Sequence, residues 1–220
     1  SFKAYEKESV RVYNDDMNIG VNKYKITDNP ILKVKYKQEF YRKAEEFNKE
    51  HMLGANDLKK RKEAIDSVLL LADADSFIGL PNAEQQINNL DQALKGDSFL
   101  SNEDFNKNIY DSYVAKINSL AVEGDPSADY DEAIRLTNEL EKFKRYNGSA
   151  VVSGKREQSF AVLKEKILGE SIRHEGKVEK IIQGNKFFEY SNGQKKLLEA
   201  TFFNAFDAKF NKAVNKERAF

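Results

Sequence analysis

The sequence predicts an all-α fold, an irregular bundle of about seven antiparallel helices. Only three prolines and 11 glycines interrupt the 220 residues, which favours long helices. Hydrophobic residues make up 40% of the chain, including 15 Phe and 10 Tyr, so a sizeable core can form. The segment 147–155 is small, polar and flanked by glycines, which is typical of a boundary. We therefore expect a single helical domain over residues 1–220, with a sub-boundary at 147–155.

The first two helices differ in the strength of their signals. A loose apolar pattern predicts a helix over residues 2–18, and residues 19–29 are expected to form a connector or a short extended piece. The second helix is clearer, because the capping residue Asn29 directly precedes Pro30 at the first helical position. An apolar stripe at three- and four-residue spacing then leads to Gly54, a natural end for this helix.

Two further helices complete the first half of the chain. Asn56 or Asp57 is expected to cap the third helix, which carries apolar residues on one side. A Gly-Leu-Pro break follows, after which Asn82 can cap a short fourth helix that stops at Gly96.

The fifth helix has the best local signal in the chain. Ser101 and Asp104 have the form of a capping box, in which the Ser101 oxygen accepts from the Asp104 amide. Leu100 and Phe105 stand at the two positions of a hydrophobic staple. A regular apolar stripe follows, and the Gly-Asp-Pro segment that begins at Gly124 ends the helix.

The second half of the chain is also predicted to be helical. A sixth helix runs from Tyr130 to Phe143, and helix resumes after 147–155. Residues 177–191 are predicted to form two helical pieces broken at Gly184. The alternative is a short β-hairpin, because Gly-Asn is an acceptable two-residue turn.

The last predicted helix covers about residues 194–216 and has an unusually wide apolar arc. This arc spans roughly 180°, against the ~100° stripe of a surface helix. Such a helix must lie in a groove between at least two neighbouring helices, or bind a partner with the part of its apolar arc that one neighbour leaves uncovered. The candidate partner surface, for another protein or a second copy of this chain, consists of four phenylalanines: Phe202, Phe203, Phe206 and Phe210.

Charge is segregated along the chain, although the formal net charge is zero. Residues 1–62 carry 15 Lys and Arg against 10 Asp and Glu, residues 63–140 carry 4 against 16, and residues 141–220 carry 17 against 10. We expect the acidic central helices to lie between or beside the basic ones. The alternative is an acidic face that receives a basic partner.

The supply of metal ligands is small. The chain has no cysteine and two histidines, His51 and His174, which are both expected on the surface near helix ends. Asp73, Asp75 and Glu84 match positions one, three and twelve of a calcium loop, but the glycine required at position six is missing. We expect an acidic helix end here, and we predict no metal site and no cofactor.

Motifs that hold nucleotides or activate a nucleophile are missing from the sequence. Neither a phosphate-binding glycine loop nor a Gly-x-Ser-x-Gly elbow occurs, so no catalytic residue is assigned. Nucleic-acid binding is disfavoured, because the basic ends also carry acids and the acidic middle would repel phosphate. No apolar run reaches the ~18 residues that span a bilayer, so no transmembrane segment is expected.

These exclusions favour a non-enzymatic helical protein with a binding or structural role. The lack of cysteine and the start at Ser1 fit the soluble part of an exported lipoprotein, in the periplasm or at the cell surface. Two alternatives stay open. One is a helical ligand-pocket protein or enzyme whose site forms only in three dimensions, and the other is an intracellular scaffold or effector module.

Overall fold

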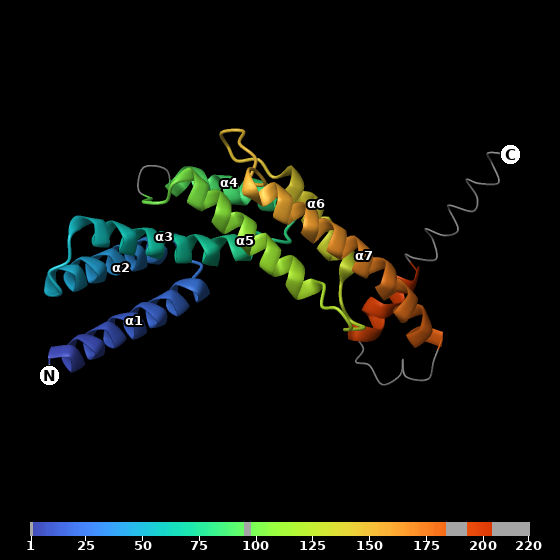
Figure 1. The fold of residues 1–220 in the computed structure, drawn as a ribbon, viewed down its shortest axis with the longest axis horizontal. Coiled ribbons are helices and arrows are strands. Elements are labelled where there is room, and N and C mark those ends of the chain that lie inside the picture. The colour runs from blue at the N-terminus through green and yellow to red at the C-terminus, as the bar shows by residue number, and fades with distance from the viewer. Residues whose placement is uncertain (1, 95–97, 184–192, 204–220) are drawn as a thin grey trace. The chain divides into compact units, whose positions relative to one another are not determined.

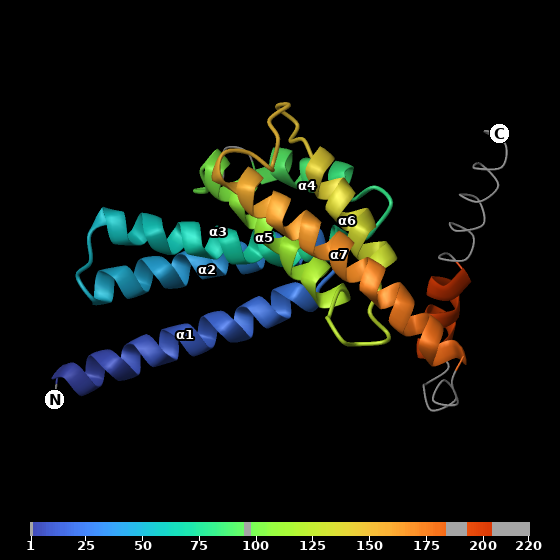
Figure 2. The same cartoon turned by 45° about the vertical axis from the view of Figure 1, so that its right-hand side comes forward.

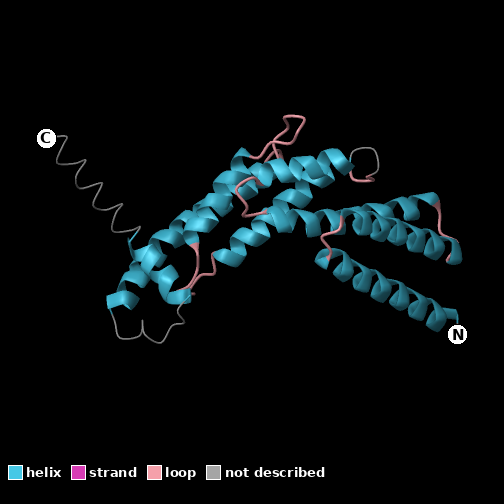
Figure 3. Cartoon of the chain, turned by 180° about the vertical axis from the view of Figure 1, so that it is seen from behind, coloured by secondary structure: helices cyan, strands magenta, loops and turns pink. Residues whose placement is uncertain are grey.

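The computed structural model describes residues 2–94, 98–183 and 193–203. The all-α prediction is confirmed, because these ranges hold helices and no strand (Figures 1 and 3). None of the described helices combines the length and the apolar character needed to cross a bilayer. Contacts divide the chain into two compact units, which are described separately below.

Unit 1 comprises Ser1–Ser112 and Lys144–Ser149, and unit 2 comprises Tyr113–Phe143 and Ala150–Phe220. One crossing between the units, after Ser149, lies inside the segment 147–155. The labelled helices are α1 (Phe2–Ile26), α2 (Pro30–Glu50), α3 (Ala55–Phe77), α4 (Ala83–Leu94), α5 (Asn102–Leu120), α6 (Tyr130–Lys142) and α7 (Lys155–Gln183). Residues 193–203 are also helical.

Helices α1, α2 and α3 pack together in unit 1, and α2 and α3 lie side by side in Figures 1 and 2. Their shared core consists of the buried residues Tyr24, Phe40, Ala44, Ile65 and Leu69. The apolar stripe that predicts the second helix therefore faces the other two helices, as helix amphipathicity requires.

Helix α1 is longer than the predicted helix over 2–18, and the expected connector at 19–29 is wrong as far as Ile26. The reason is tertiary packing. Tyr24 is 6% exposed and donates a 2.6 Å hydrogen bond to Asp73 of α3. Gly20 lies so close to Phe40 that an added Cβ would stand 3.1 Å from the Cζ atom and still closer to Cε1. Contacts with distant residues thus hold a segment whose local pattern is weak.

The predicted helix starts are confirmed where the capping bonds are local. Asn29 accepts from the amides of the second and third residues of α2, at 2.9 and 3.4 Å. Ser101 accepts from the Asp104 amide at 3.1 Å, and its hydroxyl donates to the Asp104 carboxylate at 2.8 Å. The short Asp104 side chain therefore bonds to the Ser101 hydroxyl.

The predicted cap of the third helix is wrong. Helix α3 begins one residue before Asn56, with Gly54 as its N-cap and no capping side chain. Asn48 provides the local constraint instead, because its amide donates to the carbonyls of Leu53 and Gly54 at 3.0 and 3.1 Å. The predicted end of the second helix is also too late, since α2 stops at Glu50.

In unit 2, α6 and α7 lie side by side (Figure 2). Asp129 caps α6 by accepting from the Glu132 amide at 3.1 Å. The inner faces of this unit bury large side chains that are less than 2% exposed: Tyr113, Leu136, Leu140, Phe143, Ile167, Val178 and Leu198.

Helix α7 continues through Gly169 and Gly176 without a break. Residues 177–183 are helical, so the hairpin alternative is wrong for its first half. The remaining residues of that segment, 184–191, lie outside the described part of the chain. The last predicted helix is confirmed over 194–203, and its continuation to 216 is also outside the described part.

Inside unit 1, basic residues from the two ends of the chain form ion pairs with aspartates of the acidic central region, residues 63–140. Lys33 of α2 lies 2.6 Å from the Asp73 carboxylate of α3. The guanidinium of Arg145 lies 2.7 Å from the carboxylate of Asp91 in α4, and both side chains are buried. These pairs agree with the expectation that acidic helices lie beside basic segments.

Candidate functional site

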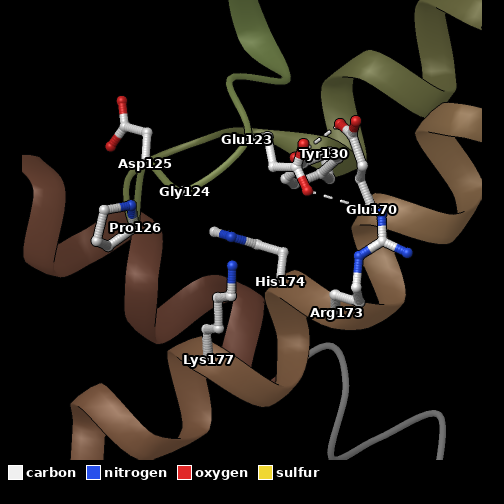
Figure 4. A pocket seen from close by; sticks show the side chains of 9 residues that line it. All are labelled: Glu123, Gly124, Asp125, Pro126, Tyr130, Glu170, Arg173, His174 and Lys177. Atoms are coloured by element: carbon white, nitrogen blue, oxygen red, sulfur yellow. Dashed lines mark hydrogen bonds and ion pairs between the residues drawn. The ribbon is translucent and has the colours of Figure 1, made fainter.

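A small pocket in unit 2 lies where the loop between α5 and α6 faces α7 (Figure 4). Its volume is about 50 Å³. We call it the His174 pocket, because His174 lies at its centre (Figure 4). Residues that line it come from the loop and from two helices: Glu123, Gly124, Asp125, Pro126, Tyr130, Glu170, Arg173, His174 and Lys177.

Helix α7 supplies four polar side chains to this pocket. Glu170, Arg173, His174 and Lys177 follow one another at three- and four-residue intervals, with Arg173 and His174 adjacent. This spacing places them on one face of a helix. The helical period therefore explains why a carboxylate, an imidazole and two cations meet at one site.

Tyr130 and Glu170 form the buried floor of the pocket. Each side chain is 4% exposed, and the Tyr130 hydroxyl donates to the Glu170 carboxylate at 3.1 Å. Burial, together with the Glu170 carboxylate, raises the pKa of Tyr130 to about 12. Tyr130 therefore keeps its proton at neutral pH and serves as a hydrogen-bond donor to Glu170.

His174 is 6% exposed, so its predicted position on the surface near a helix end is wrong. Its ring lies 4.9 Å from the Tyr130 ring, between centroids. Burial lowers the pKa of His174, and Lys177 acts in the same direction, whereas Asp125 and Asp131 oppose it. The buried Nε2 atom has no hydrogen-bond partner among the described residues. An unpartnered buried polar atom is costly and calls for an explanation.

The loop across from α7 fixes the Asp125 carboxylate and leaves Glu123 loosely held. One Asp125 oxygen accepts from the amide and the hydroxyl of Ser127, at 2.9 and 2.8 Å. Gly124 has a φ of +83°, a left-handed conformation that favours glycine. Glu123 lies 3.9 Å from the Arg173 guanidinium, and both side chains are more than 60% exposed. This outer ion pair is the loosest contact around the pocket.

Unit 1 carries a larger hollow between α1 and α2, which we call the α1–α2 groove. Its volume is about 420 Å³, within the range of ~300–1,000 Å³ typical of ligand pockets. Its apolar lining comes from Tyr5, Val12, Tyr13 and Phe47. The Tyr13 and Phe47 rings lie 4.5 Å apart, between centroids.

The polar lining of the α1–α2 groove is mostly acidic. It contains four carboxylates and two cations, namely Glu8, Asp16, Glu46 and Glu50 against Arg42 and Lys43. Glu50 accepts from the Tyr5 hydroxyl at 2.6 Å, and Glu46 is paired with Arg42. Asp16 forms no hydrogen bond or ion pair with the described residues. Glu8 is paired with Arg11, so Asp16 is the lining carboxylate that has no partner among the described residues. The Arg61 guanidinium already lies over the Tyr13 and Phe47 rings.

Helix α1 also exposes a row of apolar side chains along its length. Tyr5, Val12, Ile19 and Ile26 follow one another at seven-residue spacing and are 59%, 44%, 55% and 84% exposed. We call these four residues the heptad row. Its first two members also line the α1–α2 groove, so the row and the groove form a continuous surface.

The predicted partner surface is described only in part. Phe202 is half-buried, Phe203 is 59% exposed, and their rings meet edge to face at 5.7 Å. Phe206 and Phe210 lie outside the described residues, so the width of the apolar arc stays a prediction.

The residues of the calcium-loop spacing have other partners. Asp73 accepts from Tyr24 and Lys33, and Asp75 accepts from the Ser112 hydroxyl. Among the described residues, no group of three or more His, Asp or Glu side chains is arranged to hold a metal ion.

Sequence reasoning missed both sites, and comparison with known proteins adds nothing to them. No protein-family model, no curated protein and no solved structure matches the chain. The heptad row could have been found from its spacing, but the expected connector at 19–29 removes Ile19 and Ile26 from the helix. The His174 pocket has no sequence signal, because the loop residues and the α7 residues that line it are more than 40 residues apart.

Proposed function

We propose that the protein is a non-enzymatic binding protein that holds a basic, amphipathic helix of a protein partner on the surface formed by α1 and α2. The observation that carries this proposal is the heptad row, whose four apolar side chains are exposed along the whole length of α1. Large apolar side chains that are exposed on one face of a helix are candidates for burial against a partner.

The geometry of the row favours a helical partner. Its span from Tyr5 to Ile26 corresponds to about 31 Å at a rise of 1.5 Å per residue. A seven-residue repeat drifts by about 20° per heptad on a straight helix, so a helix that winds around α1 with a left-handed twist stays in contact with all four positions. A partner helix of about six turns would cover the row.

The charge of the neighbouring groove favours a basic partner. Its lining has two more carboxylates than cations, and Asp16 lacks a partner among the described residues. A Lys- or Arg-bearing flank of the partner helix would meet these groups, and its aliphatic stems would pack on the exposed side chains of Tyr5 and Val12.

A second copy of the chain is a poorer occupant of this surface. Helix α1 carries five basic and four acidic residues, so an α1–α1 pair would supply little positive charge to the grooves. Asp15 and Asp16 lie near the middle of α1 and would approach their own equivalents in an antiparallel pair. Like charges at such close range oppose association.

Two synthetic helices test the proposal. Both have leucine at the a and d positions of three heptads, and one has lysine and the other glutamate at the flanking positions. Fluorescence anisotropy should show that the lysine helix binds the full chain, more weakly as salt is raised, and that the glutamate helix does not. Ile19→Glu should weaken the binding at least about tenfold. Val162→Glu on α7 is the matched control, since Val162 is 64% exposed and outside the surface.

Two results would contradict the proposal. Equal binding of both synthetic helices would show that the contact is unspecific and apolar. Undiminished binding by Ile19→Glu would place the contact elsewhere. Sedimentation of the chain alone gives a third outcome, because a dimer that Ile19→Glu abolishes would assign the row to a second copy.

A further inference from the structure

In the His174 pocket, the hydrogen-bond acceptors and the hydrogen-bond donors differ in how many partners they have. The acceptors largely have partners inside the protein, whereas the donors of α7 are nearly free. We infer that this pocket binds a small oxyanion, a carboxylate or phosphate group, between the Lys177 ammonium, the Arg173 guanidinium and the imidazole of His174. This inference is independent of the partner surface on α1 and α2.

The donors of the pocket have few partners. Lys177 forms no hydrogen bond or ion pair with the described residues, and Figure 4 shows its side chain pointing toward the His174 ring. Arg173 has a single described ion pair, the 3.9 Å approach to Glu123, which is too long for a hydrogen bond. The Nε2 atom of His174 has no hydrogen-bond partner among the described residues, although His174 is only 6% exposed.

The carboxylates of the pocket have partners or can move aside. Glu170 accepts from Tyr130, and Asp125 accepts twice from Ser127. Glu123 is 66% exposed, so its charge is screened by water and its side chain can turn outward. Three carboxylates of the lining, and Asp131 near His174, would oppose an anion against two cations if all were equally close and free. Their fixed hydrogen bonds and the exposure of Glu123 reduce that opposition.

His174 can change the charge of the site, because its imidazole can bind a proton when an anion is present. The titratable and charged groups that face it are Glu123, Asp125, Tyr130, Asp131, Glu170, Arg173 and Lys177. An oxyanion beside the ring stabilises the imidazolium, so binding takes up a proton from the buffer and gives both ring nitrogens an N–H. The anion then accepts from His174 and from the two neighbouring cations of α7.

The volume limits the ligand. About 50 Å³ exceeds the ~10–15 Å³ of cavity volume that one water molecule needs, and it accommodates one small anionic group. Either a free anion or the acidic end of a larger molecule provides this chemistry.

The two histidines allow a direct measurement. The imidazole Cε1–H signals of His51 and His174 can be assigned in proton NMR spectra with the His51→Gln variant. Titration with inorganic phosphate or with acetate, at constant ionic strength maintained with chloride, should shift the His174 signal saturably and raise the pKa of His174. Saturation by phosphate alone would identify a phosphate site, and saturation by acetate alone would identify a carboxylate site.

Variants of α7 test the proposed contacts. Lys177→Gln should weaken binding at least about tenfold, as expected for the loss of one charge-assisted hydrogen bond. Lys180→Gln on the same helix should leave binding unchanged, because Lys180 does not line the pocket. Glu123→Gln should tighten binding several-fold by removing the competing carboxylate. Circular dichroism melts verify that each variant is folded.

The inference is overturned by a His174 signal that shifts linearly with both anions and never saturates. It is equally overturned if Lys177→Gln and Lys180→Gln weaken binding to the same extent, which would indicate unspecific attraction to a basic helix. Neither result would affect the proposal for α1 and α2, which is tested on a different surface.

Discussion

The Arg145 guanidinium bonds to both oxygens of the Asp91 carboxylate, with nitrogen–oxygen distances of 2.7 to 2.9 Å. Both side chains are less than 10% exposed. A remaining nitrogen of Arg145 donates to the Asn102 side chain at 2.9 Å, and the guanidinium lies 4.4 Å above the Phe105 ring. One residue of the segment 144–149 thus binds α4 and the start of α5 within unit 1.

Removing one partner of this buried pair should be costly. We expect Asp91→Ala to lower the free energy of unfolding by about 3–5 kcal/mol, because it leaves the Arg145 charge buried without its carboxylate. Urea titration followed by circular dichroism measures the change. The double variant with leucine at positions 91 and 145 should recover much of the loss, since apolar replacements of buried ion pairs are often well tolerated.

An exposed pair provides the matched control. Lys107 and Asp111 are both more than half exposed and lie 3.1 Å apart one turn along α5. We expect Asp111→Ala to change the free energy of unfolding by less than about 0.5 kcal/mol. If the two aspartate variants lose equal stability, the buried pair has no special role in unit 1.

Substitution by alanine should have opposite effects at two helical glycines, because Gly20 of α1 lies against α2 whereas Gly176 of α7 has open space beside it. An alanine Cβ at position 20 would overlap the edge of the Phe40 ring, which is 2% exposed and has little room to move. We expect Gly20→Ala to lower the free energy of unfolding by about 1–2 kcal/mol despite its better helix propensity. Gly176 of α7 has no atom within 4 Å of an added Cβ, so Gly176→Ala should raise it by about 0.5–1 kcal/mol. Thermal melts of both variants test the difference in sign.

The Ser101 cap should be measurable at the start of α5. Ser101→Ala removes the acceptor of the Asp104 amide and should cost about 1 kcal/mol. Ser101→Thr keeps an acceptor at the same place and should lose no more than a few tenths of a kcal/mol. Equal losses in a denaturant titration would show that the cap bond contributes nothing.

The fold was predictable where its causes are local. The bonds of Asn29 and Ser101 join residues two or three positions apart, so their residue types alone indicate the helix starts. The end of α1 was not predictable in this way. Its last two turns are held by Tyr24, whose partner Asp73 lies 49 residues further along the chain.

The candidate sites were less predictable than the fold for the same reason. Asp91 and Arg145 are 54 residues apart, and nothing in either local sequence selects the other among many charged residues. Tyr130 and Glu170 of the His174 pocket are 40 residues apart. The heptad row is the exception, because its spacing is visible once α1 is known to reach Ile26. Long-range packing therefore decides which sequence patterns are exposed as candidate sites in the folded protein.

The burial of His174 predicts how stability depends on pH. Burial lowers the pKa of His174 in the folded state below its usual value of 6.5, so the unfolded chain binds a proton more readily at this position. The contribution of neutral His174 to the free energy of unfolding is therefore fully present above about pH 7. It is lost as the pH drops through 6.5 toward the pKa of His174 in the folded protein. Wild-type protein should lose free energy of unfolding between about pH 7.5 and 5.5, and His174→Gln should lose less.

The buffer decides whether this loss is seen, because a bound oxyanion would stabilise the imidazolium. Without phosphate and carboxylate, the wild-type slope should exceed that of His174→Gln over the whole interval. With saturating phosphate or acetate, whichever binds, the two slopes should converge, since the folded pKa of His174 rises toward its unfolded value. Parallel slopes without the anions would mean that the folded protein does not penalise the charged form of His174. A difference that persists unchanged with both anions would show that neither of them reaches the ring.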